Sequence, residues 1–254
     1  MQKTALVLSA GGMFGAYQAG AYKAIADLAP PDIVVGASVG ALNGWAIAGG
    51  CTPDELIARW QHPSAGDALT LFPNHGLRNG WFDPAPLRAQ AEVLYRDYQP
   101  RLPFGVVLVE LRNLRPRLVQ LPHVHAAHLH ATCSIPVFMP PVSIAGKRFL
   151  DGGLFEKLPL WAAIEMGATR IIAVDSLPNV GKWWLHLATD IAHVFRKPKR
   201  YAADLDLTII SPSGRLGDAN DAVFWNRANI DRWVDMGMRD AARAIGRADF
   251  IRVS

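Results

Sequence analysis

The stretch over residues 31–50 constrains the fold of this chain more than any other. A short apolar run over residues 32–35 leads directly into G-x-S-x-G, formed by Gly36, Ser38 and Gly40, and small residues follow. When a strand turns at once into a helix, the middle residue of the turn is exposed at the carboxyl end of the strand. Glycines on both sides let the two elements approach closely. The sequence therefore predicts a buried strand, a tight turn with Ser38 at its tip, and a helix.

Such a turn suits a serine nucleophile. Free N–H groups and the dipole of the following helix favour negative charge that develops next to Ser38. A serine hydroxyl also needs a base that takes its proton and N–H donors aimed at an oxyanion. The same pattern fits an ordinary β–α turn of small residues, so the motif alone leaves both interpretations open.

Apolar runs that alternate with helical patterns predict an α/β fold around a mainly parallel sheet. A strand over residues 4–9, a glycine turn, a helix over residues 16–29 and a strand over residues 32–35 form a right-handed βαβα start. Thr52 caps a further helix, and residues 61–81 are expected to be an ordinary connecting loop rather than a lid. Further helices are expected over residues 84–98, 123–131, 159–166, 183–195 and 230–247, and further strands over residues 104–111, 117–121, 148–150, 170–174 and 205–210.

Composition limits the classes of function. The chain has 254 residues, of which 50% are hydrophobic, so it can bury a large core, and the absence of repeats and linkers predicts one domain over residues 1–254. Its 26 basic and 22 acidic residues give a net charge of +4, which fits attraction to an anionic surface such as phospholipid. Arginines are spread without interleaved aromatic residues, so nucleic acid is not an expected partner. Cys51 and Cys133 lack disulfide or metal spacing and indicate buried thiols in a reducing compartment.

Two uncharged stretches resemble targeting or membrane segments. The apolar part of residues 4–22 is too short for a signal peptide and is interrupted by Ser-Ala-Gly-Gly. Residues 33–53 carry no charge, but their glycines favour a buried strand, turn and helix over a membrane span. We therefore expect a soluble, cytoplasmic protein of undetermined oligomeric state. Residues 183–200 fit equally an amphipathic helix on a membrane surface and a core-packed helix with a basic end.

Two other stretches could complete a site around Ser38. Gly11 and Gly12 follow the first strand, so they lie at the same sheet edge as Ser38 if both strands are parallel neighbours. Glycine lets backbone N–H groups point into a cleft, which makes both residues candidate oxyanion donors. A dinucleotide-binding turn would need an acid at the end of the second strand, whereas Asp32 stands at its start. Asp151 in D-G-G could supply a base, although a lone D-G-G is usually a turn.

Four motifs occur in a fixed order along the chain. They are LSAGGMFGAYQAG from Leu8, GASVG from Gly36, CSIP with a following PPV from Cys133, and LDGGL with a following LPL from Leu150. Together they resemble the patatin-like phospholipases over residues 4–175, and residues 176–254 would complete the domain. The resemblance implies a three-layer α/β/α fold, lipid acyl esters as substrates, and no metal or organic cofactor.

The resemblance also implies roles for single residues. Ser38 would be the acyl-accepting nucleophile, and Asp151 would be the base that takes its proton and later activates water. The N–H groups of Gly11 and Gly12 would form the oxyanion hole. Supporting glycines of the same motifs are Gly15, Gly36, Gly40, Gly152 and Gly153.

Two positions depart from the family pattern. Ala10 stands where the family usually has Gly, and Phe14 stands where it usually has Arg or Lys. We expect Phe14 to create a more apolar mouth and to weaken any preference for charged phospholipids.

Histidines provide two rival interpretations. A Ser–His–Asp hydrolase could use His186 or His193, but that class has several strands before the nucleophile and this chain has one. A metal cluster would need His123, His125, His128 and His130 on one side of a helix. Alternate positions face opposite sides and only His125 and His128 are spaced i,i+3, so we expect a solvated or core-edge helix.

The favoured function is therefore a serine acyl hydrolase acting on phospholipids, lysophospholipids or related esters, with possible peripheral membrane contact. An acyltransferase that uses the same acyl-enzyme is an alternative, because sequence does not separate water from another acceptor. A lipid-binding protein with weak catalysis is the second alternative.

Overall fold

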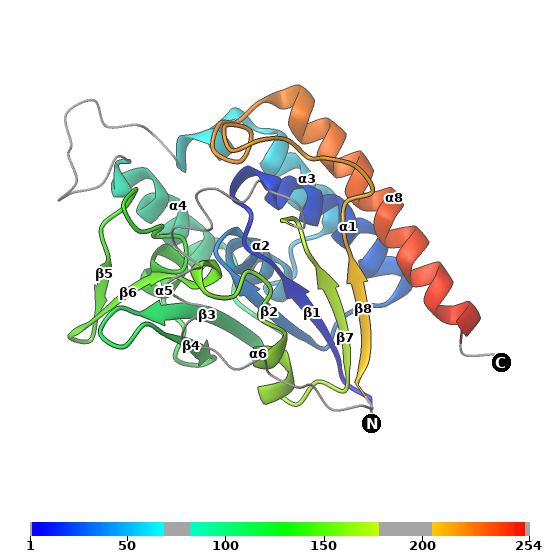
Figure 1. Cartoon of the computed structure of the whole chain (residues 1–254), viewed down its shortest axis with the longest axis horizontal. Helices are drawn as coiled ribbons and strands as arrows, with labels where there is room; N and C mark the ends of the chain where they lie inside the picture. Colours follow the sequence, from blue (N-terminus) through cyan, green and yellow to red (C-terminus); the bar gives the residue numbers. More distant parts are fainter. Residues whose placement is uncertain (1, 69–81, 178–204, 252–254) are drawn as a thin grey trace.

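The computed structural model describes residues 2–68, 82–177 and 205–251 (Figure 1). The strands are β1 (Thr4–Leu8), β2 (Ile33–Ala37), β3 (Phe104–Glu110), β4 (Arg115–Gln120), β5 (Val142–Ile144), β6 (Lys147–Asp151), β7 (Arg170–Val174) and β8 (Asp206–Ile210). The α-helices are α1 (Gly15–Leu28), α2 (Val39–Ala48), α3 (Pro53–Gln61), α4 (Pro84–Asp97), α5 (Ala126–Ala131), α6 (Leu160–Glu165) and α8 (Arg227–Ile251). Short 3-10 helices are η1 (Gly12–Phe14), η2 (Pro63–Ala68) and η3 (Gly152–Leu154).

One mixed sheet of eight strands forms the centre, in the order β5-β6-β3-β2-β1-β7-β8, with β4 also paired to β3. The strands β3, β2, β1, β7 and β8 are parallel, as the alternating pattern predicts. The pairs β3–β4, β3–β6 and β5–β6 are antiparallel. Short turns join β3 to β4 and β5 to β6, as antiparallel neighbours allow. The sheet is therefore parallel in its core and antiparallel at one end.

Each central strand divides its apolar side chains between two helical layers. Leu6 and Leu8 of β1 belong to the core that α1, α2, α3, α4, α5 and α8 cover. Ala5 and Val7 face the opposite side, where they pack with α6. Such alternation follows from the period of two residues in a strand. The helices on the two faces confirm the expected three-layer α/β/α arrangement (Figure 1).

Several local boundaries differ from the sequence expectations. The helix expected over residues 123–131 begins at Ala126, where the N–H of His125 donates to Nδ1 of His128 at 3.0 Å and caps it. The expected histidine pair is thus a helix cap. The helix expected over residues 230–247 extends over Arg227–Ile251. The expected helix over residues 183–195, and residues 69–81 of the expected loop, lie outside the described residues.

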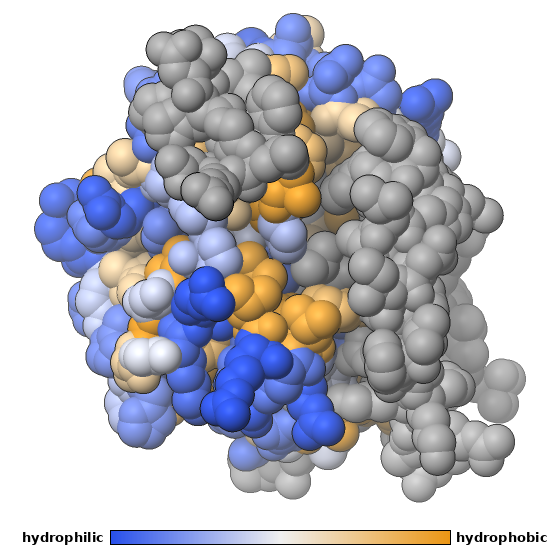
Figure 2. Space-filling view, turned by 60° about the vertical axis from the view of Figure 1, so that its left-hand side comes forward, coloured by the Kyte–Doolittle hydropathy of each residue, from blue (hydrophilic) through white to orange (hydrophobic). Residues whose placement is uncertain are grey.

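The surface carries both apolar and hydrophilic areas. Among the described helices, none is both long and apolar enough to span a bilayer. The face that lies towards the left of Figure 1 shows an apolar area near its middle, with hydrophilic side chains along its border (Figure 2). Cys51 and Cys133 are buried and free, as expected.

The longest helix, α8, packs against α1 with almost no space between the two backbones. A Cβ atom on Gly20 would collide with the carbonyl oxygen of Val234, and one on Gly237 would collide with that of Tyr17. Because glycine lacks a Cβ, it is the residue that allows such an approach. The hydroxyl of Tyr17 also donates to Asp240 Oδ2 at 3.3 Å. This contact ties the end of the chain to the helix that follows the first glycine turn.

We predict that Gly20→Ala lowers the melting temperature even though alanine favours helices. The added methyl group would force two backbones apart, which costs about 1–3 kcal/mol. Gly246→Ala in α8 is the matched control, since within the described residues a Cβ there would meet no atom within 4 Å beyond its own helix turn. That variant should gain up to about 1 kcal/mol from helix propensity. Thermal unfolding of both variants checks the contact, and equal melting temperatures would contradict it.

Candidate active site

The strand register brings Ser38 and Asp151 together at one edge of β3. β4 occupies one edge of β3 from Gly105 to Glu110, so β2 and β6 must share the other edge. On that edge Ala37 is opposite Val107, and Asp151 is opposite the next residue, Leu108. β2 is parallel to β3 and β6 is antiparallel, so the carboxyl ends of β2 and β6 meet head to head.

The two side chains are in direct contact. Ser38 Oγ donates a hydrogen bond to Asp151 Oδ2 at 2.7 Å. Ser38 has 6% and Asp151 has 5% of its surface exposed, so both are nearly closed off from solvent. A carboxylate at this distance can accept the hydroxyl proton.

The turn at Ser38 has the strained geometry expected of a strand–turn–helix nucleophile. Ser38 has φ 53° and ψ −133°, which is a rare backbone conformation for a residue with a side chain. A Cβ on Gly36 would collide with the backbone of Gly40, and one on Gly40 with the carbonyl oxygen of Leu8. Both glycines are therefore required where β2, α2 and β1 approach each other.

The carboxyl group of Asp151 is buried and polarised. Its Oδ1 accepts the N–H of Gly153 at 2.6 Å. Burial raises the pKa of Asp151 from its ordinary value of 3.8 to about 7, although hydrogen bonds from Ser38 and Gly153 act in the opposite direction. A carboxyl group with this pKa can both take and return a proton near neutral pH.

A residue that the sequence argument did not single out, Thr132, joins the two strand ends. The N–H of Ser38 donates to Thr132 Oγ1 at 2.9 Å, and that hydroxyl donates to the carbonyl of Val107 at 2.7 Å. The N–H of Gly152 donates to the carbonyl of Thr132 at 3.2 Å. Thr132 is fully buried and precedes the C-S-I-P motif, but sequence alone does not reveal that it contacts both strand ends.

The first glycine turn presents free backbone donors. Within the described residues, the N–H groups of Gly11 and Gly12 donate to no carbonyl or side chain. Gly12 has φ +55°, which favours glycine, and the next N–H, that of Met13, donates to Ala222 at 2.9 Å. The N–H of Val39, the residue after Ser38, also has no acceptor among the residues that the structure describes. This third candidate donor was not part of the sequence expectation.

Buried side-chain amides bind the backbone at both ends of the first glycine turn. Gln18 Nε2 donates to the carbonyl of Ser9 at 2.7 Å, just before the turn. Asn43 Nδ2 donates to the carbonyl of Gly15 and to Gln18 Oε1, both at 3.0 Å. Trp60 Nε1 completes the network by donating to Asn43 Oδ1 at 3.0 Å. Both ends of the turn are thus fixed to α1, α2 and α3.

The two departures from the family pattern have different surroundings. Ala10 packs so closely on Gly153 that a Cβ on Gly153 would collide with that of Ala10. Phe14 is fully buried, and its ring makes an edge contact with Trp233 of α8, with centroids 5.0 Å apart. The expected apolar mouth at Phe14 is therefore wrong, because the side chain faces the core between α1 and α8.

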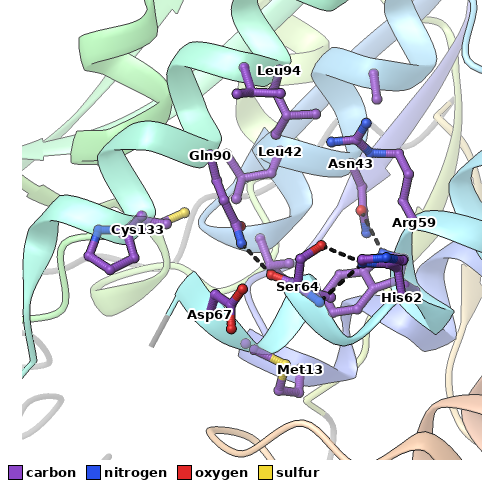
Figure 3. A pocket seen from close by; sticks show the side chains of 18 of the residues that line it. Met13, Leu42, Asn43, Arg59, His62, Ser64, Asp67, Gln90, Leu94 and Cys133 are labelled. Atoms are coloured by element: carbon purple, nitrogen blue, oxygen red, sulfur yellow. Dashed lines mark hydrogen bonds between the residues drawn. The ribbon is translucent and has the colours of Figure 1, made fainter. Parts of the chain in front are cut away.

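A cavity of about 770 Å³ begins at Ser38 and extends between α2, α3 and α4. Figure 3 shows Leu42 and Leu94 on one side of this cavity, with polar residues near its other side. On that side, Gln90 Nε2 donates a hydrogen bond to the carbonyl oxygen of Ser64 at 2.7 Å. The hydroxyl of Ser64 is hydrogen-bonded to His62 Nδ1 at 2.8 Å. The lining is mostly apolar near Ser38, so it suits a hydrocarbon chain.

The histidines near the site do not form a metal cluster in the described part of the chain. No group of three or more His, Cys, Asp or Glu side chains is arranged there to hold a metal ion. Burial lowers the pKa values of His128 and His130. The rival bases His186 and His193 lie outside the described residues.

The sequence of the chain is similar to that of known proteins. The sequence model described as patatin-like phospholipase matches residues 6–164. The chain is 27% identical over 204 residues to patatin-like phospholipase domain-containing protein 7 of Rattus norvegicus and 26% identical to the Mus musculus protein of that name. Each match covers 71% of this chain, and the chain spans 15% of the length of either relative.

A solved structure is similar in fold. VipD from Legionella pneumophila matches with a TM-score of 0.55 at 13% identity, over 98% of this chain and 67% of that one. At this identity the likeness concerns the fold alone. The sequence match extends over more than half of the chain and includes the strands and turns that carry Ser38 and Asp151, so the chain belongs to the patatin-like phospholipase family.

Proposed function

We propose that this chain is a serine acyl hydrolase that cleaves lipid acyl esters of the phospholipid or lysophospholipid class through Ser38 and Asp151. The observation that carries the proposal is the hydrogen bond of 2.7 Å from Ser38 Oγ to Asp151 Oδ2. Family membership supports lipid acyl esters as the substrate class.

In the proposed acylation step, Asp151 takes the hydroxyl proton while Ser38 Oγ bonds to the ester carbonyl carbon. The N–H groups of Gly11 and Gly12, with that of Val39, would stabilise the negative charge on the carbonyl oxygen. The C–O bond to the alcohol then breaks, and Asp151 returns the proton to the leaving oxygen. The result is an acyl ester on Ser38 and a free alcohol.

Deacylation repeats the same steps with water. Asp151 takes a proton from water, the resulting oxygen attacks the acyl carbon, and the bond to Ser38 Oγ breaks. Ser38 regains its proton from Asp151, and the fatty acid leaves. The cavity between α2, α3 and α4 would hold the acyl chain throughout, since its walls near Ser38 include Val39, Leu42 and Ala46.

Thr132 has the contacts of a positioning residue in this mechanism. Its hydroxyl holds the backbone of Ser38, and its carbonyl holds Gly152, next to Asp151. Loss of the hydroxyl would leave the N–H of Ser38 and the carbonyl of Val107 buried without their partner. A shift of about 1 Å between reacting groups can cost about 100-fold in rate.

We predict that a fluorescent fluorophosphonate labels the wild type and does not label Ser38→Ala. Asp151→Asn should slow labelling and lower ester hydrolysis by about 100-fold to 10,000-fold, because an amide does not take the proton. Gel fluorescence and fatty-acid release measure both effects. Unchanged hydrolysis in both variants would exclude the proposed pair.

The raised pKa of Asp151 predicts a pH profile. The base must be ionised, so kcat/KM should rise about tenfold per pH unit below pH 7 and level off above it. Initial rates with an uncharged soluble ester from pH 5 to pH 9, within the stable range of the fold, test this profile. A profile that is already flat between pH 5 and pH 7 would contradict a buried carboxyl base with a raised pKa.

The same shift gives a folding control for Asp151→Asn. Between the ordinary value of 3.8 and about 7, the folded state binds more protons than the unfolded state, so the free energy of unfolding falls as pH rises. The Asp151→Asn variant has no ionisable group at this position, so its free energy of unfolding does not fall with pH for this reason. Its gain in melting temperature over the wild type should therefore be larger at pH 8 than at pH 5.

For Thr132 we predict that Thr132→Val lowers kcat by about 10-fold to 100-fold with little change in KM, since the residue orients Ser38 without touching the acyl chain. Thr132→Ser keeps the hydroxyl and should restore most of the rate. Steady-state kinetics of both variants separate orientation from packing. Equal rates for the valine variant and the wild type would remove Thr132 from this role.

A further inference from the structure

A long segment beside the candidate site contains no acidic residue. Residues 111–150 have no Asp or Glu, and their Arg and Lys residues are Arg112, Arg115, Arg117, Lys147 and Arg148. Arg117 pairs with Glu110 at 3.0 Å. The other four side chains are exposed, and within the described residues none of them makes a salt bridge. This part of the surface therefore has a positive charge that neighbouring carboxylates do not cancel.

These cations lie on the turn after β3 and on the β5–β6 hairpin, which ends at Asp151. Glu110, the last residue of β3, is opposite Phe149, so Lys147 and Arg148 extend beyond the carboxyl end of β3. The turn after β3 lies beside them, because the N–H of Leu111 donates to the carbonyl of Arg148 at 2.8 Å. The β3–β4 turn and the β5–β6 hairpin thus form one projecting edge, at the left of Figure 1.

Exposed apolar side chains occur within the same segment, residues 111–150. Leu114 in the β3–β4 turn is 42% exposed, and Val137 and Phe138 after α5 are 59% and 39% exposed. Leu114 has φ 51° and Val137 has φ 70°, a region that glycine and asparagine adopt more easily than branched residues. Neither burial nor backbone preference accounts for these residues, which indicates a role outside the stability of the fold.

The exposed pair Val137 and Phe138 adjoins the cavity. Ile135 lines the cavity together with Ser38, and the N–H of Met139 donates back to the carbonyl of Ile135 at 2.8 Å. Met139 is buried, so the loop between these two residues projects outward. The ring of Phe138 lies 5.7 Å from that of Phe82, which packs in the same small cluster as Met139.

We propose that this edge docks on an anionic lipid surface and presents the cavity to it. We define the docking edge by Arg112, Leu114, Arg115, Val137, Phe138, Lys147 and Arg148. Its cations would contact anionic headgroups, and its apolar side chains would enter the interfacial region. The inference rests on the proposed function, because a lipid ester substrate resides in such a surface. Binding of nucleic acid would use the cations but would give no role to exposed Leu and Val side chains.

The test compares vesicle binding of two double variants with that of the wild type. Lys147→Ser/Arg148→Ser removes charge, and Leu114→Asn/Val137→Asn removes apolar contact with a residue that tolerates positive φ. Matched controls are Arg239→Ser on α8 and Leu28→Asn at the end of α1, both at exposed positions. Sedimentation uses vesicles of phosphatidylcholine alone and of phosphatidylcholine mixed with phosphatidylglycerol. Hydrolysis of soluble p-nitrophenyl butyrate is measured in parallel.

We expect the wild type and both controls to bind the mixed vesicles and to bind phosphatidylcholine vesicles weakly. Each cation removed should lower the partition coefficient about five-fold, and the pair about 25-fold. The asparagine pair should bind less tightly while its melting temperature stays the same or rises. Hydrolysis of the soluble ester should be unchanged in both double variants, because none of the four residues lines the cavity.

Three outcomes separate the docking edge from the proposed function. Equal vesicle binding by the wild type and both double variants would overturn the docking edge. Hydrolysis of the soluble ester without wild-type binding to mixed vesicles would also overturn it and would leave the function in place. In the third outcome, the wild type binds vesicles, the double variants do not, and the wild type hydrolyses no ester. This result would support the docking edge and contradict the proposed function.

Discussion

The meeting of two strand ends on one edge of β3 is the constraint on which the site depends. β2 arrives parallel to β3 and β6 arrives antiparallel, so the residues at their carboxyl ends, Ser38 and Asp151, face each other. Continued strands would collide at this point, and both chains must turn away at once. The glycines around Ser38 and after Asp151 permit these turns, because a Cβ at Gly40 or Gly152 would collide with the backbone of β1 or β3.

This arrangement includes two energetically unfavourable residues, which the rest of the fold has to stabilise. Ser38 has a rare backbone conformation, and Asp151 is buried in surroundings that disfavour its ionised form. Thr132 and the central parallel strands hold both residues in place. A flexible junction would lose the contact of 2.7 Å between the hydroxyl and the carboxylate. The rigid sheet therefore keeps Ser38 and Asp151 in direct contact, as the proposed mechanism requires.

The glycine turn after β1 depends on a different set of contacts. Gln18 and Asn43 fix its ends, and the N–H of Met13 is bound by the carbonyl of Ala222, which lies just before α8. Phe14 extends this link by packing on Trp233 in α8. The C-terminal helix thus supports the turn that presents the N–H groups of Gly11 and Gly12. A helix distant in sequence thus contributes to the geometry of the first motif.

The sequence by itself determined most strands and helices, since apolar periodicity and caps such as Thr52 are local properties. Motif order also predicts Ser38 and Asp151 as a pair, because the resemblance to the family implies it. Only the tertiary structure decided that β6 pairs antiparallel with β3, that Phe14 faces the core, and that Thr132 joins the strand ends. These features depend on contacts between residues far apart in the chain, and local patterns do not encode which distant partners meet.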